Sequence, residues 1–211
     1  MKTNIQSKIE TKYPLLFVNL TPIFFMQEKQ RKLKVAQLLD SLTKGNNSQK
    51  LIALKELKEI GDVSVIETLV PYLLNPNNEI KKETTEIFCS LQQQEAADVI
   101  IDVLRKSDDV VLKQLLLNTM WNSKLDYSNY LADIVSIALE GDFMLAIECL
   151  TLIENMSGPF EEHHLLESQL HLKEYLENER GKDDRKDLMV SDIASFIRDQ
   201  NEGVDADLLL D

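Results

Sequence analysis

A short apolar pattern recurs along this chain at an interval of about 31 residues. Ile66, Leu69, Val70 and Leu73 return as Ala97, Ile100, Ile101 and Leu104. The residues before each pattern repeat as well, because Ala53, Leu57 and Ile60 return first as Thr84, Phe88 and Leu91 and, three periods later, as Ala146, Leu150 and Ile153. A period of about 30 residues with two amphipathic helices per copy is typical of an α-solenoid, in which each repeat buries its apolar face by stacking on its neighbours. The sequence therefore predicts an all-α, right-handed solenoid.

About four helix pairs fit this period. We expect them at residues 48–60 with 64–74, 78–91 with 95–106, 109–122 with 128–140, and 142–156 with 161–178. Ser48 and Ser64 are candidate N-caps, since serine side chains accept hydrogen bonds from the first turn of a helix. The repeat interval lengthens at the third pair, and the extra residues fall in the connection 123–127, where a solenoid tolerates insertions.

A further helix is expected at each end of the repeats, because a solenoid needs capping helices to cover its terminal apolar faces. The N-terminal cap is predicted at residues 28–44, with Leu33, Ala36, Leu39 and Leu42 facing inward. The C-terminal cap is predicted at residues 185–200, and its packing residues are Leu188, Ile193 and Ile197. The helical domain would thus cover residues 26–200.

The two ends of the chain do not share the repeat pattern. Residues 1–25 form an N-terminal extension that is either disordered or upstream of a true start at Met26. Its apolar part, residues 13–25, is too short to span a bilayer and has no small-residue cleavage site, which disfavours a signal peptide. Residues 201–211 are expected to form an acidic mobile tail, in which Leu208, Leu209 and Leu210 are either a docking motif or a frayed end.

The net charge of −13 limits the classes of partner. Residues 1–60 carry 11 basic and 5 acidic side chains, whereas residues 61–211 carry 12 basic and 31 acidic ones. Neutralising phosphates needs clustered Lys and Arg, so we expect no nucleic-acid and no membrane partner. The uneven charge either favours a protein partner with a basic surface and self-association of copies, or serves solubility alone.

Two cysteines, Cys89 and Cys149, sit among apolar helix residues. Two thiols in a chain of 211 residues are not a disulfide framework, which fits a reducing compartment, and we expect a cytoplasmic protein. Neither local sequence offers the electropositive setting that a reactive thiol needs. The cysteines are interpreted as small core residues.

The helix pair containing Ala53, Leu57, Ile60, Gly61-Asp62, Ile66, Leu69 and Leu73 resembles a HEAT repeat of the short variety found in bacterial and phycobilisome-lyase-like proteins. The resemblance covers about residues 48–178, although only the first pair keeps the Gly-Asp turn. Segments 120–128 and 153–160 also resemble an uncharacterised group of bacterial HEAT-like proteins. That group implies no known activity.

Three aromatic residues, Trp121, Tyr127 and Tyr130, surround the irregular connection of the third pair. Aromatic rings with a polar tip are favoured as interface anchors. The resemblance to HEAT proteins implies that the second helices line a concave binding face, which would bring Tyr130 towards a partner. The alternative is that these rings only wedge the longer connection into the core.

An acidic rim is expected beside these aromatic residues. It consists of Glu67, Asp98, Asp102 and Asp133, all on predicted second helices. Such a rim would select a basic surface or segment on a protein partner.

His164, Glu167 and His171 are spaced so that they share one side of a helix. Zinc or iron accepts such ligands, yet one helix supplies too few of them and no second helix carries histidine. HEAT-like di-iron hydroxylases carry several His-Glu pairs, and this chain has no His-Glu dipeptide. We therefore expect no metal, and the alternative is a solvated polar face.

No phosphate-binding glycine loop, nucleophile elbow or Cys-His pair is found, so we predict no catalytic residue and no cofactor. The predicted function is that of a non-catalytic scaffold or adaptor that binds protein. The alternative, suggested by the resemblance alone, is a phycobilin-lyase-like or other small-molecule-handling factor. A HEAT-like DNA glycosylase would need a basic groove, which the charge of residues 61–211 opposes.

Overall fold

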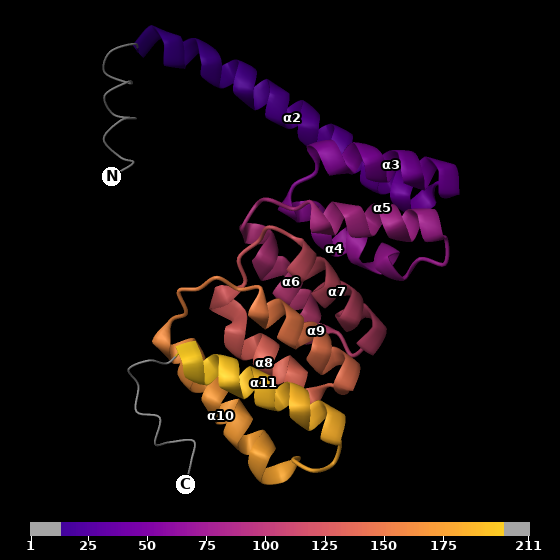
Figure 1. Ribbon diagram of the computed structural model, residues 1–211. Coiled ribbons are helices and arrows are strands. Elements are labelled where there is room, and N and C mark those ends of the chain that lie inside the picture. The colour runs from indigo at the N-terminus through magenta and orange to yellow at the C-terminus, as the bar shows by residue number, and fades with distance from the viewer. Residues whose placement is uncertain (1–13, 201–211) are drawn as a thin grey trace. The chain divides into compact units, whose positions relative to one another are not determined.

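The computed structural model describes residues 14–200, with side chains from residue 27 onward (Figure 1). Every regular element in this range is helical, which confirms the all-α prediction. The expected tail 201–211 and the first part of the expected extension, residues 1–13, lie outside the described residues. The first elements are α2 (Pro14–Lys44), α3 (Asn47–Ile60), η1 (Val63–Val65), α4 (Ile66–Leu69), η2 (Val70–Leu74) and α5 (Asn78–Cys89). They are followed by α6 (Glu95–Lys106), α7 (Val110–Asn122), η3 (Ser128–Tyr130), α8 (Leu131–Glu140), α9 (Phe143–Glu154), α10 (Glu162–Asn178) and α11 (Asp184–Gln200).

The chain divides into two compact units, residues 1–61 and residues 62–211. The boundary falls at Gly61, between the two helices of the first expected pair. No helix within residues 14–200 has the length and apolar character required to cross a membrane.

In the first unit, α2 packs against α3. The helix α2 begins at Pro14, well before the expected start at residue 28, and it passes through Met26 without a break. Arg31 links the two helices, since its guanidinium donates to the carbonyl of Ile60 at 2.9 Å and pairs with Glu28 at 2.8 Å. Lys34 and Glu56 form a second link at 2.7 Å.

The inward face of α2 differs from the predicted one. Val35, Leu38 and Leu42 are buried, whereas Leu33 is 62% exposed and Ala36 is exposed as well. Both sets of residues have helical spacing, so periodicity alone does not choose between them. The contacts of α2 with its neighbours decide the face, and of the predicted residues only Leu42 is fully buried.

The N-caps of the first pair are also different from those predicted. Asn46, not Ser48, caps α3 and forms a capping box with Gln49. The Asn46 side chain accepts a hydrogen bond from the Gln49 backbone N–H, and the Gln49 side chain accepts one from the Asn46 backbone N–H. Asp62, not Ser64, caps η1 by accepting from the Ser64 N–H. A cap must stand outside the first helical turn, and both serines lie within it.

The second unit is held together by contacts between helices two places apart in the chain. Contacts join α5 to α7, α7 to α9 and α9 to α11, and others join α4 to α6 and α8 to α10. Both copies of the repeated apolar pattern are at most 7% exposed. The repeat period of the sequence therefore marks residues of the core.

Helix boundaries in this unit follow the prediction closely from α6 onward. The predicted helix 64–74 is instead divided into η1, α4 and η2, and Pro71 lies in η2. A proline has no N–H for the helical hydrogen-bond ladder, which accounts for the irregular stretch. Asp109 and Asp142 cap α7 and α9 by accepting backbone N–H bonds at 3.0 and 2.9 Å.

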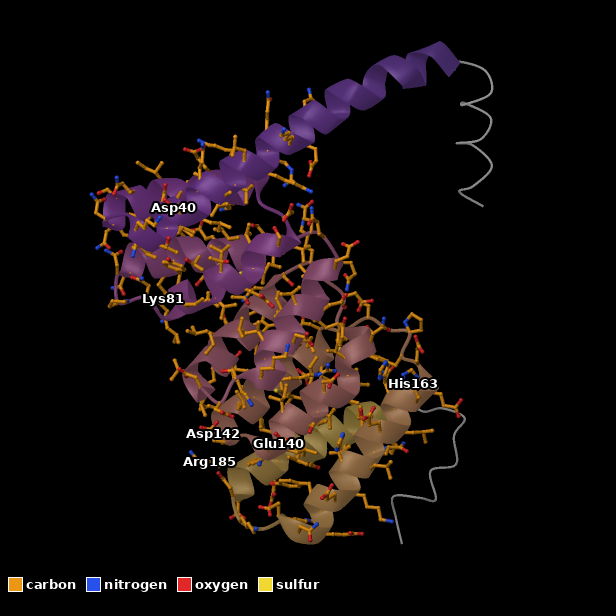
Figure 2. All side chains as sticks on the ribbon, turned by 180° about the vertical axis from the view of Figure 1, so that it is seen from behind. Asp40, Lys81, Glu140, Asp142, His163 and Arg185 are labelled. Atoms are coloured by element: carbon orange, nitrogen blue, oxygen red, sulfur yellow. The ribbon has the colours of Figure 1, made fainter. Side chains whose placement is uncertain are left out.

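The last helix, α11, packs on α8, α9 and α10. Ile193 and Ile197 are fully buried, as predicted, but Leu188 is 64% exposed. The start of α11 lies beside the turn between α8 and α9, where Figure 2 places Arg185 near Glu140 and Asp142. Lys186 donates to the carbonyl of Leu139 at 2.5 Å, and the Arg185 guanidinium lies 4.8 Å from the centre of the Phe143 ring.

Candidate interaction surface at the third helix pair

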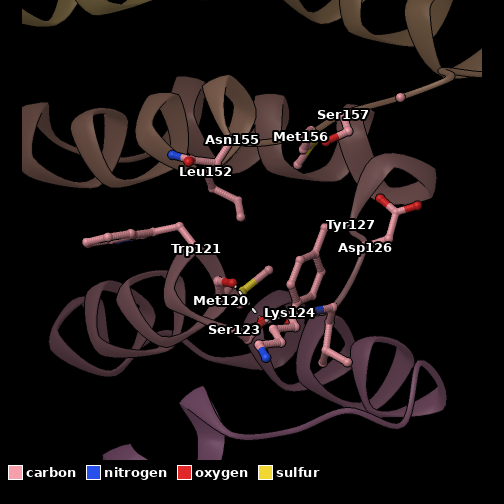
Figure 3. A pocket seen from close by; sticks show the side chains of 12 residues that line it. Met120, Trp121, Ser123, Lys124, Asp126, Tyr127, Leu152, Asn155, Met156 and Ser157 are labelled. Carbon is pink, nitrogen blue, oxygen red and sulfur yellow. Dashed lines mark hydrogen bonds between the residues drawn. The ribbon is translucent and has the colours of Figure 1, made fainter.

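A cavity of about 350 Å³ lies between the end of α7 and the end of α9. The connection 123–127 forms one wall, and residues 155–158 form the other. This connection is the segment that lengthens the third repeat. The structure thus turns the extra residues of the sequence into the wall of a cavity (Figure 3).

The cavity has an apolar floor and a polar rim. The buried side chains that line it are those of Met120, Leu125, Tyr127 and Leu152. Met156 and Trp121 are half-buried, and the exposed rim consists of Lys124, Asp126, Asn155 and Ser157. A site of this composition suits an apolar group that carries or adjoins a polar one.

Tyr127 is a core residue, since only 2% of it is exposed. Its hydroxyl is buried and makes no hydrogen bond to any described residue. Burial raises its pKa to about 12, against a smaller opposite effect of Ser123, whose own hydroxyl donates to the Met120 carbonyl at 2.8 Å. This position matches the alternative of a ring wedged into the connection. Contact of Tyr127 with a partner stays a prediction.

Tyr130 is half-buried at the end of η3, and its hydroxyl donates to the carboxylate of Asp98 on α6. The predicted aromatic anchor and the predicted rim residue thus bind each other. An intramolecular role is sufficient to account for the position of both side chains.

Two further members of the predicted rim also have partners within the chain. Asp133 on α8 forms an ion pair with Arg105 on α6. Asp102 lies 3.9 Å from Arg105 and 3.4 Å from Lys106. The hydrogen bond from Arg105 to Asp133 is the main cause that raises the pKa of Arg105. The fourth member, Glu67, is exposed on α4.

Three polar links therefore join α6 to the third pair, and we name them the polar ladder: Gln94 with Asp126, Asp98 with Tyr130, and Arg105 with Asp133. Sequence reasoning did not single out Gln94 or Arg105. Gln94 lies 32 residues before its partner and Arg105 lies 28 residues before its partner, and both separations are close to the repeat period. A search for complementary polar side chains about one repeat apart would have identified these two residues.

Trp121 lines the cavity and also fixes α7 to α9. Its indole N–H donates to the Glu148 carboxylate at 3.2 Å. The ring is half-buried, so one part of it packs and another part remains accessible. Trp121 is the one predicted aromatic contact that combines partial exposure with a place on the cavity wall.

Several titratable groups lie outside this cavity in the part of the chain whose side chains are described. Burial raises the pKa of the Cys149 thiol, and burial together with Glu86 raises that of Cys89. His171 lines a separate groove of about 240 Å³ with Glu140 and Glu174. Within the described residues, no group of three or more His, Cys, Asp or Glu side chains is arranged to hold a metal ion.

Comparison with protein-family models, with curated proteins and with solved structures finds no match for this chain.

Proposed function

We propose that this protein is a non-catalytic protein-binding module built as a right-handed solenoid of HEAT-like helix pairs. The support for the architecture is the recurring contact between elements two places apart, α5 with α7, α7 with α9 and α9 with α11. Stacked helix pairs produce such contacts, and they leave long helical surfaces for binding.

The cavity beside the third pair is the observation that carries the proposal. Two methionines, Met120 and Met156, and the indole of Trp121 lie at its floor and side, and its rim is exposed. Aromatic residues and methionine are enriched at protein interfaces, and methionine adapts to the shape of an incoming group. An apolar side chain from a partner would fill this cavity while the rim contacts the polar backbone around it.

Charge supports a basic partner. Residues 61–211 carry 31 acidic and 12 basic side chains, and Glu67, Asp98 and Asp102 are exposed on α4 and α6. The polar ladder offsets part of this negative charge within the chain. The remaining negative charge would act mainly by raising the rate at which a basic partner associates. Binding of this kind weakens as salt is added.

A second candidate function, small-molecule handling, is favoured by the size of the cavity. Its volume of about 350 Å³ lies at the lower end of the range of ligand pockets. A ligand there would contact the buried floor residues and the Asn155 and Ser157 side chains of the rim.

The test uses a substitution that fills the cavity from its rim. Ser157 is exposed, and Ser157→Trp places a large ring at the opening without altering the buried floor. Lys173→Trp on α10 is the matched control, because Lys173 is exposed and lies outside the cavity. Tagged full-length proteins are incubated with extract of the native cells, crosslinked and analysed by mass spectrometry.

We expect a stoichiometric protein partner that the wild type and Lys173→Trp retain, that Ser157→Trp loses, and that high salt releases. A partner set unchanged by Ser157→Trp would contradict binding at the cavity. Native mass spectrometry of the purified protein distinguishes the second candidate, which requires a bound small molecule that Ser157→Trp displaces.

A further inference from the structure

A second, larger groove lies between α10 and α11, which run side by side in the second unit (Figure 1), and its volume is about 560 Å³. Its base consists of the buried side chains of Leu172, Tyr175 and Val190. Its sides carry two accessible leucines, Leu176 at 41% and Leu188 at 64% exposure. An apolar side chain that entered this groove would remove leucine surface from water.

One end of the groove is held in shape by hydrogen bonds. Asp187 on α11 accepts one from the Tyr175 hydroxyl at 2.8 Å and another from the Gly181 backbone N–H at 2.7 Å. These bonds join α10, the turn after it and α11. The groove therefore exists before an occupant enters, and binding does not have to supply the free energy of forming it.

Acidic side chains border the groove on α11. Asp184 and Asp187 belong to its lining, and Asp184 is exposed. The exposed Asp192 follows Leu188 by about one helical turn. Arg180 is the one basic residue among the described residues that line the groove. This balance of charge favours a basic occupant.

The first unit carries a helix face that matches the groove in charge and in apolar character. Lys29, Lys32, Leu33 and Ala36 are exposed on α2, and their spacing places them on one side of this helix. Leu33 is 62% exposed, and the two lysines lie within about one turn of it. We name these four residues the basic face of α2.

The surroundings of the two surfaces have the same opposite charges. Residues 27–61 carry eight basic and four acidic side chains, whereas residues 161–200 carry six basic and eleven acidic ones. At physiological ionic strength, salt screens exposed charges beyond about 8 Å. The attraction between these surfaces therefore depends on their local charges more than on the net charge of −13 that each copy carries.

We propose that copies of this chain associate head to tail, with the basic face of α2 of one copy in the groove between α10 and α11 of another. Leu33 packs against the two exposed leucines of the groove, and the lysines pair with Asp184 and Asp192. The contact joins two different surfaces, so a pair of copies keeps one groove and one basic face free for further copies. This self-association does not depend on the cavity beside the third helix pair.

Analytical ultracentrifugation of the full-length chain tests the contact with two blocking substitutions. Leu33→Glu blocks the basic face, and Leu188→Glu blocks the groove. Ile52→Glu on α3 and Leu170→Glu on α10 are the matched controls, because these residues are 59% and 68% exposed and belong to neither surface. Each substitution is at an exposed position, and circular dichroism verifies that the variants remain helical.

We expect the wild type and both controls to form larger species as the protein concentration rises, and added salt to weaken this association. Each blocked variant is expected to associate with a dissociation constant at least tenfold higher. A wild type that stays monomeric at every concentration would overturn the proposal. Blocked variants that associate as strongly as their matched controls would overturn it as well.

A mixture of the two blocked variants distinguishes the head-to-tail contact from a symmetric one. Leu33→Glu keeps an intact groove and Leu188→Glu keeps an intact basic face, so the mixture restores a single contact. We expect a dimer with one copy of each variant and no larger species. A mixture that stays monomeric would refute the head-to-tail contact, because in a symmetric interface both copies use the same surface.

Discussion

Gln94 and Asp126 exchange two hydrogen bonds, although 32 residues separate them. The Gln94 side-chain amide donates to the Asp126 carbonyl at 2.5 Å, and its carbonyl oxygen accepts from the Asp126 N–H at 3.0 Å. Gln94 stands at the N-terminus of α6, and Asp126 lies in the connection that forms one wall of the cavity. One amide side chain thus satisfies both backbone groups of a residue in an irregular segment.

Gln94→Ala removes both bonds, and we expect it to lower the free energy of unfolding by about 1–2 kcal/mol. Gln93→Ala is the matched control, because Gln93 is exposed beside it and only its backbone carbonyl takes part in a hydrogen bond, with Ala96. Urea unfolding followed by circular dichroism measures both. Equal midpoints for the two variants would show that solvent replaces the Gln94 bonds without cost.

Tyr127→Phe is expected to be neutral or stabilising by about 1 kcal/mol at neutral pH. The hydroxyl of Tyr127 is buried without a hydrogen bond, so its removal relieves a desolvation cost and preserves the packing of the ring. Thermal unfolding measures the change. A clear loss of stability would reveal a hydrogen bond of the hydroxyl, for which Ser123 is a candidate partner.

Tyr175→Phe provides the opposite case, because the hydroxyl of Tyr175 donates to the Asp187 carboxylate. Its loss is expected to reduce the free energy of unfolding by about 1–2 kcal/mol, since bonds to charged groups are the stronger ones. The same thermal unfolding experiment checks it. If Tyr127→Phe and Tyr175→Phe change stability in the same direction, the assignment of bonded and unbonded hydroxyls is wrong.

The stability of the protein is expected to fall in alkali partly because of Tyr127. Burial raises its pKa from 10.0 to about 12, so the unfolded chain loses this proton first. The contribution of the neutral hydroxyl is complete below pH 10 and is lost as the pH rises through about 12. Tyr127→Phe should therefore flatten the decline between these values in urea unfolding, and an unchanged slope would argue against the burial of the hydroxyl.

Asp187 is expected to make the stability of the protein depend on pH in the acidic range. The Gly181 N–H bond first, and then the Tyr175 hydroxyl, lower the pKa of its carboxyl below the ordinary 3.8. Its contribution is present above pH 3.8 and is lost as the pH falls through the lowered folded value. Asp187→Asn should reduce the dependence of stability on pH below 3.8. Unfolding midpoints of this variant and of the wild type, measured across the acidic range, check the prediction, and parallel curves would contradict it.

The cap of α7 offers a local test of the helix boundaries. Asp109 accepts a hydrogen bond from the Leu112 N–H at 3.0 Å, and Asp109→Ala is expected to cost about 1 kcal/mol of stability. Asp108→Ala is the control, because Asp108 carries the same charge one position earlier, outside the cap. Chemical unfolding of both variants measures the difference, and equal losses would mean that charge near the helix end, not the cap bond, stabilises α7.

Periodicity predicted the helices of this protein well because it reports directly on burial. The range expected for α6 agrees with the structure at both ends, and both isoleucines expected to pack in α11, Ile193 and Ile197, are fully buried. Leu188 and Leu33 were expected inside and are exposed. A helix has more apolar residues than its neighbours cover, so the pattern identifies candidates for burial and the packing selects among them.

The sequence by itself determined the all-helical fold, the recurring core positions and the place of the irregular connection, because each follows from local spacing and turn chemistry. Only the tertiary structure decided that Tyr127 lies inside this connection, that Tyr130 and Asp133 bind Asp98 and Arg105, and that the extra residues enclose a cavity. These contacts join side chains about one repeat apart. Their formation depends on how helix pairs meet in space, which local spacing does not specify.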